Sequence, residues 1–168
     1  ELDTRLAMEE LRYLPKEVLE LWTRETDGAR ALSSEDRRRA RATVPIRQAL
    51  VKALHDGGAG LLLGTDCMNA FVVPGFSVHE ELRLLVEAGL TPFEALATGT
   101  RNAARALGLE HEVGTIAPGL RADLLLLEAN PLDDVAHAGE LAGVVLRGRW
   151  HPSDDLERRL ETIERKNR

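Results

Sequence analysis

The sequence predicts an α/β protein, and three observations along the chain support this prediction. Before residue 112, most segments carry apolar side chains at helical spacing. One short apolar run, Leu61-Leu62-Leu63, directly follows a helix and the turn Gly57-Gly58-Ala59-Gly60, as is typical of a buried parallel strand. Over residues 113–150 the pattern changes to short apolar runs separated by Gly and Pro, which predicts a small β unit.

The first part of the chain predicts three helical segments. Residues 2–22 place leucine, valine and tryptophan at helical spacing, and Pro15 opens a second short helix, because proline is tolerated in a first turn. The cap signal Ser33-Ser34-Glu35-Asp36 begins the next helix. Because proline lacks the backbone N–H and crowds the preceding turn, Pro45 predicts a kink or an interruption of that helix.

The later elements follow from similar signals. Ser77 predicts the cap of a helix that ends at Ala88-Gly89. The run Thr91-Pro92-Phe93-Glu94 predicts the start of another helix, which continues to Leu107-Gly108. In the β unit, the apolar runs over residues 122–127 and 141–146 predict strands, and residues 153–168 predict a highly charged helix.

Charge and composition exclude several classes of protein. With 22 Lys and Arg against 28 Asp and Glu, the formal net charge is −6, which argues against a nucleic-acid partner. We interpret the basic run Arg37-Arg38-Arg39 as the solvated face of a helix, because Glu35 and Asp36 precede it. No apolar stretch approaches the roughly 20 residues that span a bilayer, so we expect no membrane partner. The single cysteine, Cys67, excludes a disulfide framework and leaves the compartment open.

Asp66 is the strongest candidate for chemistry. It directly follows the predicted strand, and active sites in α/β folds are built at the carboxyl ends of parallel strands. The alternative is an aspartate that caps the turn after a strand.

A string of motifs in this sequence resembles the metal-dependent amidohydrolases, and within them the imidazolonepropionase-like and prolidase-like branch. The resemblance is strong over residues 45–150 and weak over residues 1–44. The matching segments are Leu61-Leu62-Leu63-Gly64-Thr65-Asp66, Pro74-Gly75, His79-Glu80-Glu81-Leu82, Leu85-Val86-Glu87-Ala88-Gly89-Leu90-Thr91-Pro92, Thr100-Arg101-Asn102-Ala103-Ala104, Gly114-Thr115-Ile116, Pro118-Gly119, Ala122-Asp123-Leu124, Asn130-Pro131-Leu132 and Gly148-Arg149-Trp150.

The resemblance implies a (β/α)8 barrel beside a small β-sandwich. A full barrel needs about 250 residues, so we expect this chain to be the C-terminal part of such a protein. Residues 1–112 would then belong to the barrel, with its last strand at about 60–65. Residues 113–150 would form a segment of the β-sandwich, and residues 151–168 a charged C-terminal helix. The start, Glu1-Leu2-Asp3-Thr4-Arg5, has neither an initiator Met nor a signal-peptide plan, which is consistent with a processed or longer protein.

For function, the resemblance implies hydrolysis of C–N bonds in small-molecule amides, cyclic amides or dipeptide-like substrates. It also implies one or two divalent metals, commonly zinc, with Asp66 as metal ligand and proton shuttle. The family's His-X-His pair has no match, so most metal ligands would lie outside this chain. The histidines present are His55, His79, His111, His137 and His151.

Two further expectations concern His79 and the isolated chain. The resemblance places His79 near the mouth of the active site, where it orients substrate or supports the neighbouring loop, with capping or packing as the alternative.

We expect a homo-oligomer for the full-length enzyme. The alternative function is a non-catalytic fragment or partner subunit that completes a barrel supplied by another chain. Because a partial barrel leaves strand edges and apolar faces open, the chain alone should be inactive and should associate with itself.

Overall fold

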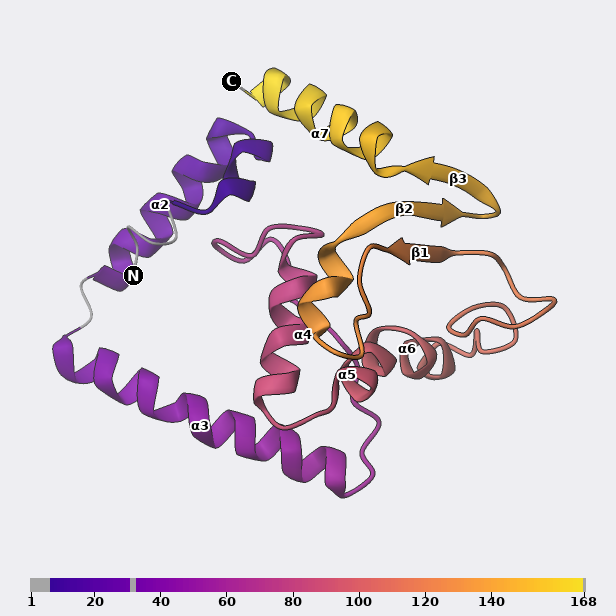
Figure 1. Cartoon of the computed structure of the whole chain (residues 1–168). Coiled ribbons are helices and arrows are strands. Elements are labelled where there is room, and N and C mark those ends of the chain that lie inside the picture. The colour runs from indigo at the N-terminus through magenta and orange to yellow at the C-terminus, as the bar shows by residue number, and fades with distance from the viewer. Residues whose placement is uncertain (1–6, 31–32, 168) are drawn as a thin grey trace.

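A computed structural model describes residues 7–30 and 33–167, and its mixture of helices with a small sheet confirms the α/β class (Figure 1). The helical elements are η1 (Glu9–Tyr13), α2 (Lys16–Arg30), α3 (Ser34–Asp56), α4 (Ser77–Glu87), α5 (Pro92–Gly99), α6 (Arg101–Ala106), η2 (Val135–Gly139) and α7 (Ser153–Asn167). The strands are β1 (Leu124–Leu127), β2 (Leu141–Leu146) and β3 (Arg149–Pro152).

Two helices of the first part begin where their signals predict, but α2 continues to Arg30, past the end predicted at residue 22. Residues 2–6 of the first predicted segment lie outside the described residues, and the 3-10 helix η1 follows them. Helix α2 starts directly after Pro15, and the Ser33 hydroxyl accepts a hydrogen bond from the Asp36 backbone N–H at 3.1 Å in front of α3. The predicted interruption at Pro45 is wrong, because α3 continues through it to Asp56. A proline removes only one backbone hydrogen bond, and the turns on both sides of it keep the long helix continuous.

Helix α4 differs from the prediction at its first turn. Ser77 is not the cap; Phe76 occupies that position and makes no side-chain cap hydrogen bond. The chain enters α4 through backbone turns, in which the Ser77 N–H donates to the Val73 carbonyl at 3.0 Å and the His79 N–H to the Phe76 carbonyl at 3.2 Å. The second bond satisfies an N–H group that a serine cap at residue 77 would otherwise serve. The Ser77 hydroxyl itself is buried without a hydrogen-bond partner.

The helix predicted over residues 91–107 is formed as two helices. Thr91 caps α5 in a capping box, since its hydroxyl accepts from the Glu94 N–H while the Glu94 carboxylate accepts from the Thr91 N–H. Thr100, with φ −122° and ψ −99°, then separates α5 from α6. The second helix leaves the first at an angle and carries Asn102 toward the segment before Asp66.

Residues 60–65 carry no regular secondary structure in the described part of the chain. Their backbone is bound by the following helices instead: the Leu63 N–H donates to the Thr98 carbonyl at 3.3 Å, and Asn102 Nδ2 donates to the Leu61 carbonyl at 3.3 Å. A strand requires a neighbouring strand, and no described segment offers one here. The barrel strand at 60–65 therefore stays a prediction for a longer protein.

The β unit is a single antiparallel sheet in the order β1-β2-β3 within the described residues, and a second layer of the expected sandwich is not among them. Asp123 fixes the turn between β2 and β3. Its Oδ1 accepts from the Arg147 N–H at 2.7 Å, and its Oδ2 accepts from Arg121 Nε at 2.6 Å. These donors, led by the Arg147 N–H, lower the pKa of Asp123. Arg147 (φ 51°) and Gly148 (φ 78°) form the turn that Asp123 holds.

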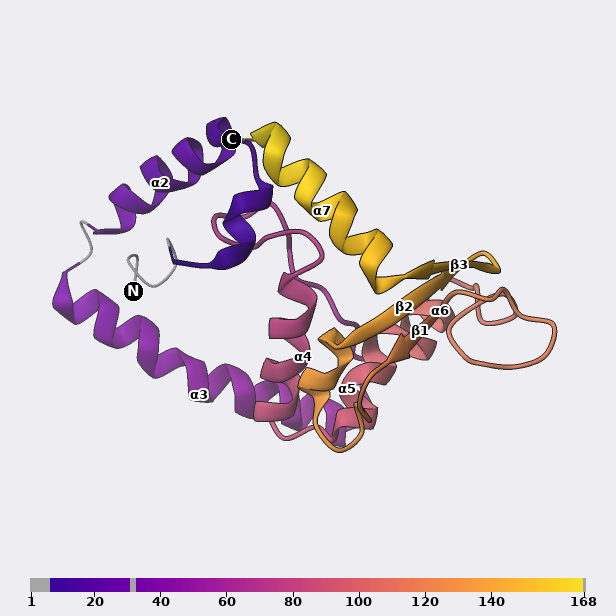
Figure 2. The same ribbon diagram turned by 45° about the horizontal axis from the view of Figure 1, so that its top comes forward.

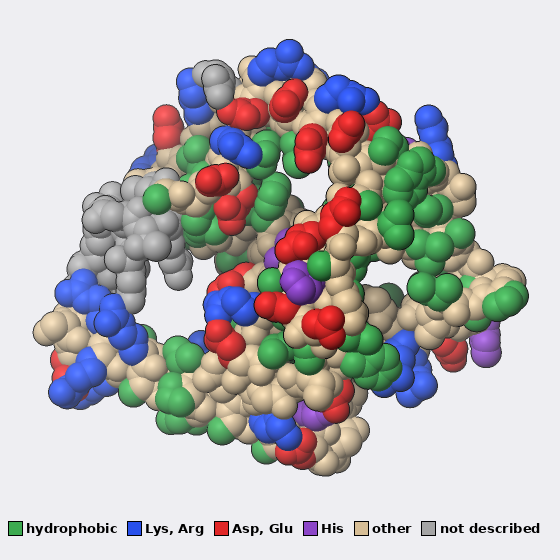
Figure 3. Space-filling view, in the orientation of Figure 1, with side chains coloured by type: hydrophobic (Ala, Val, Ile, Leu, Met, Phe, Trp, Pro, Cys, Tyr) green, Lys and Arg blue, Asp and Glu red, His purple; other side chains and the backbone are tan. Residues whose placement is uncertain are grey.

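Two apolar clusters hold the structure together. The first joins α4, α5 and η2 through Leu82, Leu85, Leu90, Ala95, Val135 and Ala138. The second joins η1 and α2 to the loop before α4 through Leu11, Trp22, Phe71 and Val73. Asn167 Nδ2 of α7 also donates to the Tyr13 carbonyl at 2.7 Å, so α7 reaches the N-terminal elements (Figure 2). The space-filling view shows openings beside α4, so this face is not closely packed (Figure 3).

Candidate functional site

Asp66 lies at the start of a loop with an unusual backbone. Its side chain is exposed, and its φ is 52°, in the left-handed region. Met68 and Phe71 follow with φ values of 79° and 65°. Left-handed backbone costs on the order of 1–3 kcal/mol for a residue other than Gly, and an aromatic residue there is a clear outlier. Three such residues within six positions show that the surrounding contacts impose this loop conformation.

Hydrogen bonds within the loop centre on Asn69. Its side-chain Nδ2 donates to Asp66 Oδ2 at 2.6 Å and to the Asp66 carbonyl at 3.1 Å. Its backbone carbonyl accepts from the Val72 N–H at 2.9 Å, and the Met68 N–H donates to the Val72 carbonyl at 3.3 Å. Asp66 Oδ1 accepts no hydrogen bond from any described residue. One carboxylate oxygen of Asp66 is thus held, and the other is free.

An apolar contact fixes the far side of the loop. Phe71 is 7% exposed and packs against Trp22 of α2, which is 2% exposed, with 5.8 Å between the ring centroids. Phe76 stacks on Tyr13 of η1 with 5.3 Å between centroids. The two N-terminal elements therefore cover the loop that begins at Asp66, and they hold it through buried aromatic rings.

The segment before Asp66 is held from the opposite direction. Asn102 and the Thr98 carbonyl bind the backbone at Leu61 and Leu63, and the Leu63 side chain packs close to Gly99. The motif around Asn102, one of the segments that resemble a known family, thus has a physical role here. It attaches the segment that carries Asp66 to helices α5 and α6.

His79 occupies the first turn of α4, where its side chain is exposed. Its ring lies against Gly139 of η2, because a Cβ at that glycine would be 3.5 Å from two ring atoms. Among the described residues, no hydrogen bond or ion pair joins His79 to Asp66. A role for His79 in substrate binding therefore stays a prediction, and packing against η2 is the contact that the structure contains.

Two other histidines make contacts within the fold. His55 Nε2 of α3 lies 3.1 Å from Glu94 Oε1 of α5, which links these two helices. His137 Nδ1 lies 2.9 Å from the Asn130 carbonyl, and this contact raises the pKa of His137. Neither ring approaches Asp66 through any contact recorded among the described residues.

A metal site would need ligands beyond those that this chain brings together. Across residues 7–30 and 33–167, no three His, Cys, Asp or Glu side chains converge where a metal could be bound. Asp66 nevertheless fits the role of a single ligand, since a carboxylate is a common donor to divalent metals and its Oδ1 is unoccupied. Among the described residues, Asp66 is therefore a candidate for a single metal ligand, and no further ligands are gathered beside it.

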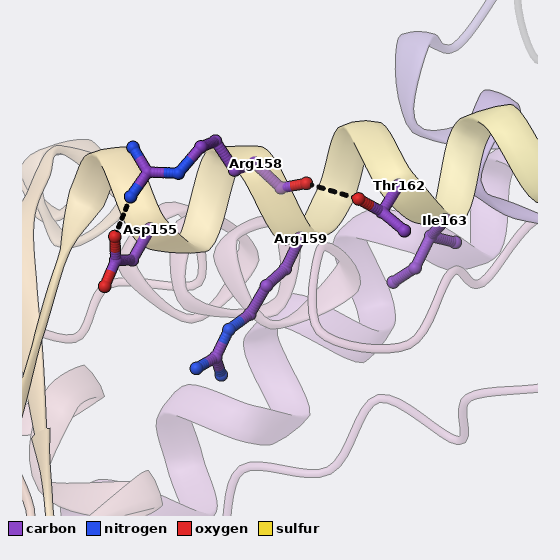
Figure 4. A pocket seen from close by; sticks show the side chains of 5 residues that line it. All are labelled: Asp155, Arg158, Arg159, Thr162 and Ile163. Atoms are coloured by element: carbon purple, nitrogen blue, oxygen red, sulfur yellow. Dashed lines mark hydrogen bonds and ion pairs between the residues drawn. The ribbon is translucent and has the colours of Figure 1, made fainter.

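A surface hollow of about 460 Å³ lies along α7, away from these residues (Figure 4). The side chains that line it all come from this one helix: Asp155, Arg158, Arg159, Thr162 and Ile163. Asp155 pairs with Arg158, and the Arg158 carbonyl accepts from the Thr162 hydroxyl at 2.8 Å. Arg159 extends away from the helix. None of the predicted site residues lines this hollow, so we do not assign it to the Asp66 site.

Sequence reasoning did not assign a role to two residues that hold the Asp66 loop, Asn69 and Trp22. A signal for Asn69 was present, because an asparagine three residues after an aspartate often bonds within a tight turn. For Trp22, the sequence indicates only an apolar position at helical spacing and no contact with the Asp66 loop. Of the described helices, none has the length and apolar character needed to cross a membrane.

This chain is similar to known proteins in both sequence and structure. The sequence profile of the amidohydrolase family matches residues 4–151. An imidazolonepropionase of Deinococcus deserti is 46% identical over 87 residues, which are 51% of this chain and 21% of that protein. One of Rubrobacter xylanophilus is 43% identical over 105 residues, 58% of this chain and 24% of that protein. The solved bottromycin amidohydrolase superposes with a TM-score of 0.75 and 30% identity, covering 93% of this chain and 35% of that one.

Proposed function

Because this chain belongs to the amidohydrolase family, we propose that it is the C-terminal part of a metal-dependent hydrolase acting on C–N bonds. The observation that carries the proposal is Asp66, an exposed carboxylate at the end of the family motif. One of its oxygens accepts from Asn69, and the other accepts no hydrogen bond from a described residue. The chain spans about a quarter or less of the length of the two imidazolonepropionases described above. The remaining parts of the active site would come from residues outside this chain.

In this proposal, Asp66 has two roles. A bound divalent metal, for which we propose Zn²⁺, would supply the activation of a water molecule. Asp66 would act as one ligand, accept the proton that the attacking water loses, and deliver it to the leaving nitrogen. One or two metals are compatible with this role, and their other ligands would lie outside the described residues.

The proposed substrates are small molecules with an amide, a cyclic amide or a dipeptide-like C–N bond. The relatives named imidazolonepropionase favour the cyclic amide among these. For His79, we propose contact with substrate at the mouth of the site, supported by its exposed position in the first turn of α4. We also propose that the full-length enzyme is a homo-oligomer.

The first test is the variant Asp66→Asn in the full-length protein. Asparagine keeps the shape of the side chain but cannot accept the proton, so kcat should fall by about 10²–10⁴-fold with an unchanged melting temperature. A matched control is Asp133→Asn, because Asp133 is exposed and its carboxylate accepts no hydrogen bond from a described residue, although its charge contributes to the raised pKa of His137. Normal turnover by a folded Asp66→Asn protein would refute the catalytic role of Asp66.

The second proposal is that the chain is a non-catalytic fragment or partner subunit. It is favoured by the lack of three converging metal-ligand side chains among the described residues. The intact mass of the native gene product separates the two proposals. A mass well above twice 18.5 kDa would support the enzyme. A mass of 18.5 kDa without a co-purifying chain that brings the missing ligands would support the non-catalytic protein.

A further inference from the structure

We propose that Asn69 is a positioning residue for Asp66, whose amide holds one carboxylate oxygen so that the other stays directed at the reacting groups. The proposal rests on the proposed function, because it assigns a role to the partner of the proposed catalytic carboxylate. It concerns the geometry of Asp66 and not a further step in the reaction.

Asn69 binds Asp66 at both its side chain and its backbone. The Asn69 amide donates to Asp66 Oδ2 at 2.6 Å and to the Asp66 carbonyl at 3.1 Å. An N–H bond to a charged carboxylate is stronger than one between neutral groups. Because a single NH₂ group binds both the side chain and the backbone of Asp66, it fixes the carboxylate relative to the main chain.

Asn69 is the one described residue that donates a hydrogen bond to the Asp66 carboxylate. The Asp66 side chain is exposed. A free aspartate in water samples several rotamers. Catalytic groups need a fixed position, since a displacement of about 1 Å can cost on the order of 10²-fold in rate. Asn69 is therefore the residue that can supply this fixed position.

Asn69 is itself held by contacts within the loop. Its N–H donates to the Asp66 carbonyl at 3.4 Å, and its carbonyl accepts from the Val72 N–H at 2.9 Å. Between these contacts, Phe71 adopts a φ of 65° and is buried against Trp22. The orientation of the carboxylate thus depends on a continuous series of contacts that begins in the buried cluster of η1 and α2 and ends at Asp66 Oδ2.

Two variants at position 69 separate this role from a merely structural one. Asn69→Ala removes the amide donor. Asn69→Asp keeps the size of the side chain but replaces the donor with an acceptor of like charge. If Asn69 only filled space in the turn, Asn69→Asp should behave like the parent protein. If it positions Asp66, Asn69→Asp should be at least as impaired as Asn69→Ala.

The experiment uses the full-length protein and three measurements. We expect kcat to fall by about 10- to 100-fold in both variants with little change in KM, because Asn69 does not touch substrate. We expect the affinity of the metal-free protein for Zn²⁺, measured by competition with a chromophoric chelator, to fall by a similar factor. The melting temperature monitors folding. Asn69→Ser, which restores a shorter donor, should recover part of both losses.

The controls make every outcome decisive. Asn130→Ala removes an asparagine whose Oδ1 accepts from the Leu132 N–H at 3.1 Å in a distant turn, and should leave kcat and Zn²⁺ affinity unchanged. Parent-like values for Asn69→Asp would overturn the proposal. If Asn69→Ala does not fold, Asn69→Asp and Asn69→Ser carry the test. If Asp66→Asn is active, the proposed function fails. If Asp66→Asn is inactive while the Asn69 variants keep parent-like activity, this inference alone fails.

Discussion

Glu94 is a residue whose charge stabilises the fold. Its carboxylate accepts from the Thr91 N–H and hydroxyl at 2.8 Å each, and His55 Nε2 lies at 3.1 Å. These contacts, led by the Thr91 N–H, lower the pKa of Glu94 to about 2. A depressed pKa means that the ionised carboxylate stabilises the folded state above its ordinary pKa, and this stabilisation is lost as the pH falls from about 4.5 to 2.

We therefore expect Glu94→Gln to lower the melting temperature at pH 7, with a difference from the parent protein that shrinks as the pH falls through this window. Thermal melts of the full-length protein between pH 3 and pH 7 would measure this. The control is Glu128→Gln, an exposed glutamate whose side chain has no described partner. A constant difference across the pH range would show that the charge of Glu94 does not stabilise the fold.

At the scale of single residues, the sequence predicts a functional role for Asp66 but does not indicate that Asn69 is its hydrogen-bond partner. Asp66 follows an apolar run and a family motif, both of which are visible in the sequence. The hydrogen bonds from Asn69 depend on left-handed backbone at Asp66 and Met68, and nothing in the residue types requires that conformation. The role of Ser77 was mispredicted for a similar reason, because backbone turns, and not a side chain, begin α4.

Among the elements, α2 has the clearest effect on the candidate site. Trp22 is almost fully buried against Phe71, so Trp22→Ala should destabilise the full-length protein by about 3–5 kcal/mol in denaturant unfolding. It should also reduce turnover, because the loop after Asp66 loses its support. Leu21→Ala, an exposed position on the same helix, should change stability by less than about 0.5 kcal/mol. Equal effects of the two variants would contradict a specific role of the aromatic contact.

Elements with local signals are predictable, and those that need distant partners are not. The caps at Ser33 and Thr91 form as predicted, because each depends on residues within one turn. A strand at 60–65 depends on neighbours elsewhere in a barrel, and the described part of this chain offers none. The contact between α2 and the loop at Phe71 joins segments that are far apart in the sequence, so periodicity alone could not indicate it.

At the scale of the whole molecule, large apolar surfaces are uncovered. Ile46, Leu50 and Leu54 recur every four residues on α3 and are exposed, and no described residue of α3 is buried. Apolar side chains also lie exposed on the small sheet, including Leu146 of β2 and Trp150 of β3. The space-filling view shows hydrophobic side chains gathered over this sheet (Figure 3). Contiguous apolar surfaces of this kind favour association with other protein segments.

We expect the isolated 168-residue chain to self-associate in sedimentation velocity experiments. The double variant Ile46→Glu, Leu50→Lys should increase the monomer fraction, because it interrupts the apolar face of α3. Arg47→Glu, an exposed polar position on the same helix, should not. A monodisperse parent chain that melts cooperatively as a monomer would contradict the prediction.

The hydrogen bond between Asn167 and Tyr13 also has a consequence for the order of folding. It joins residues 154 positions apart, whereas the hydrogen bond from the Arg147 N–H to Asp123, which holds the turn between β2 and β3, joins residues 24 positions apart. Bringing distant segments together costs more chain entropy than closing a short loop, and contacts between distant residues slow folding. The hairpin should therefore form early, while η1 and α2 dock late against α7 and the loop at Phe71. During refolding, the region around Asp66 is then among the last to reach its final geometry.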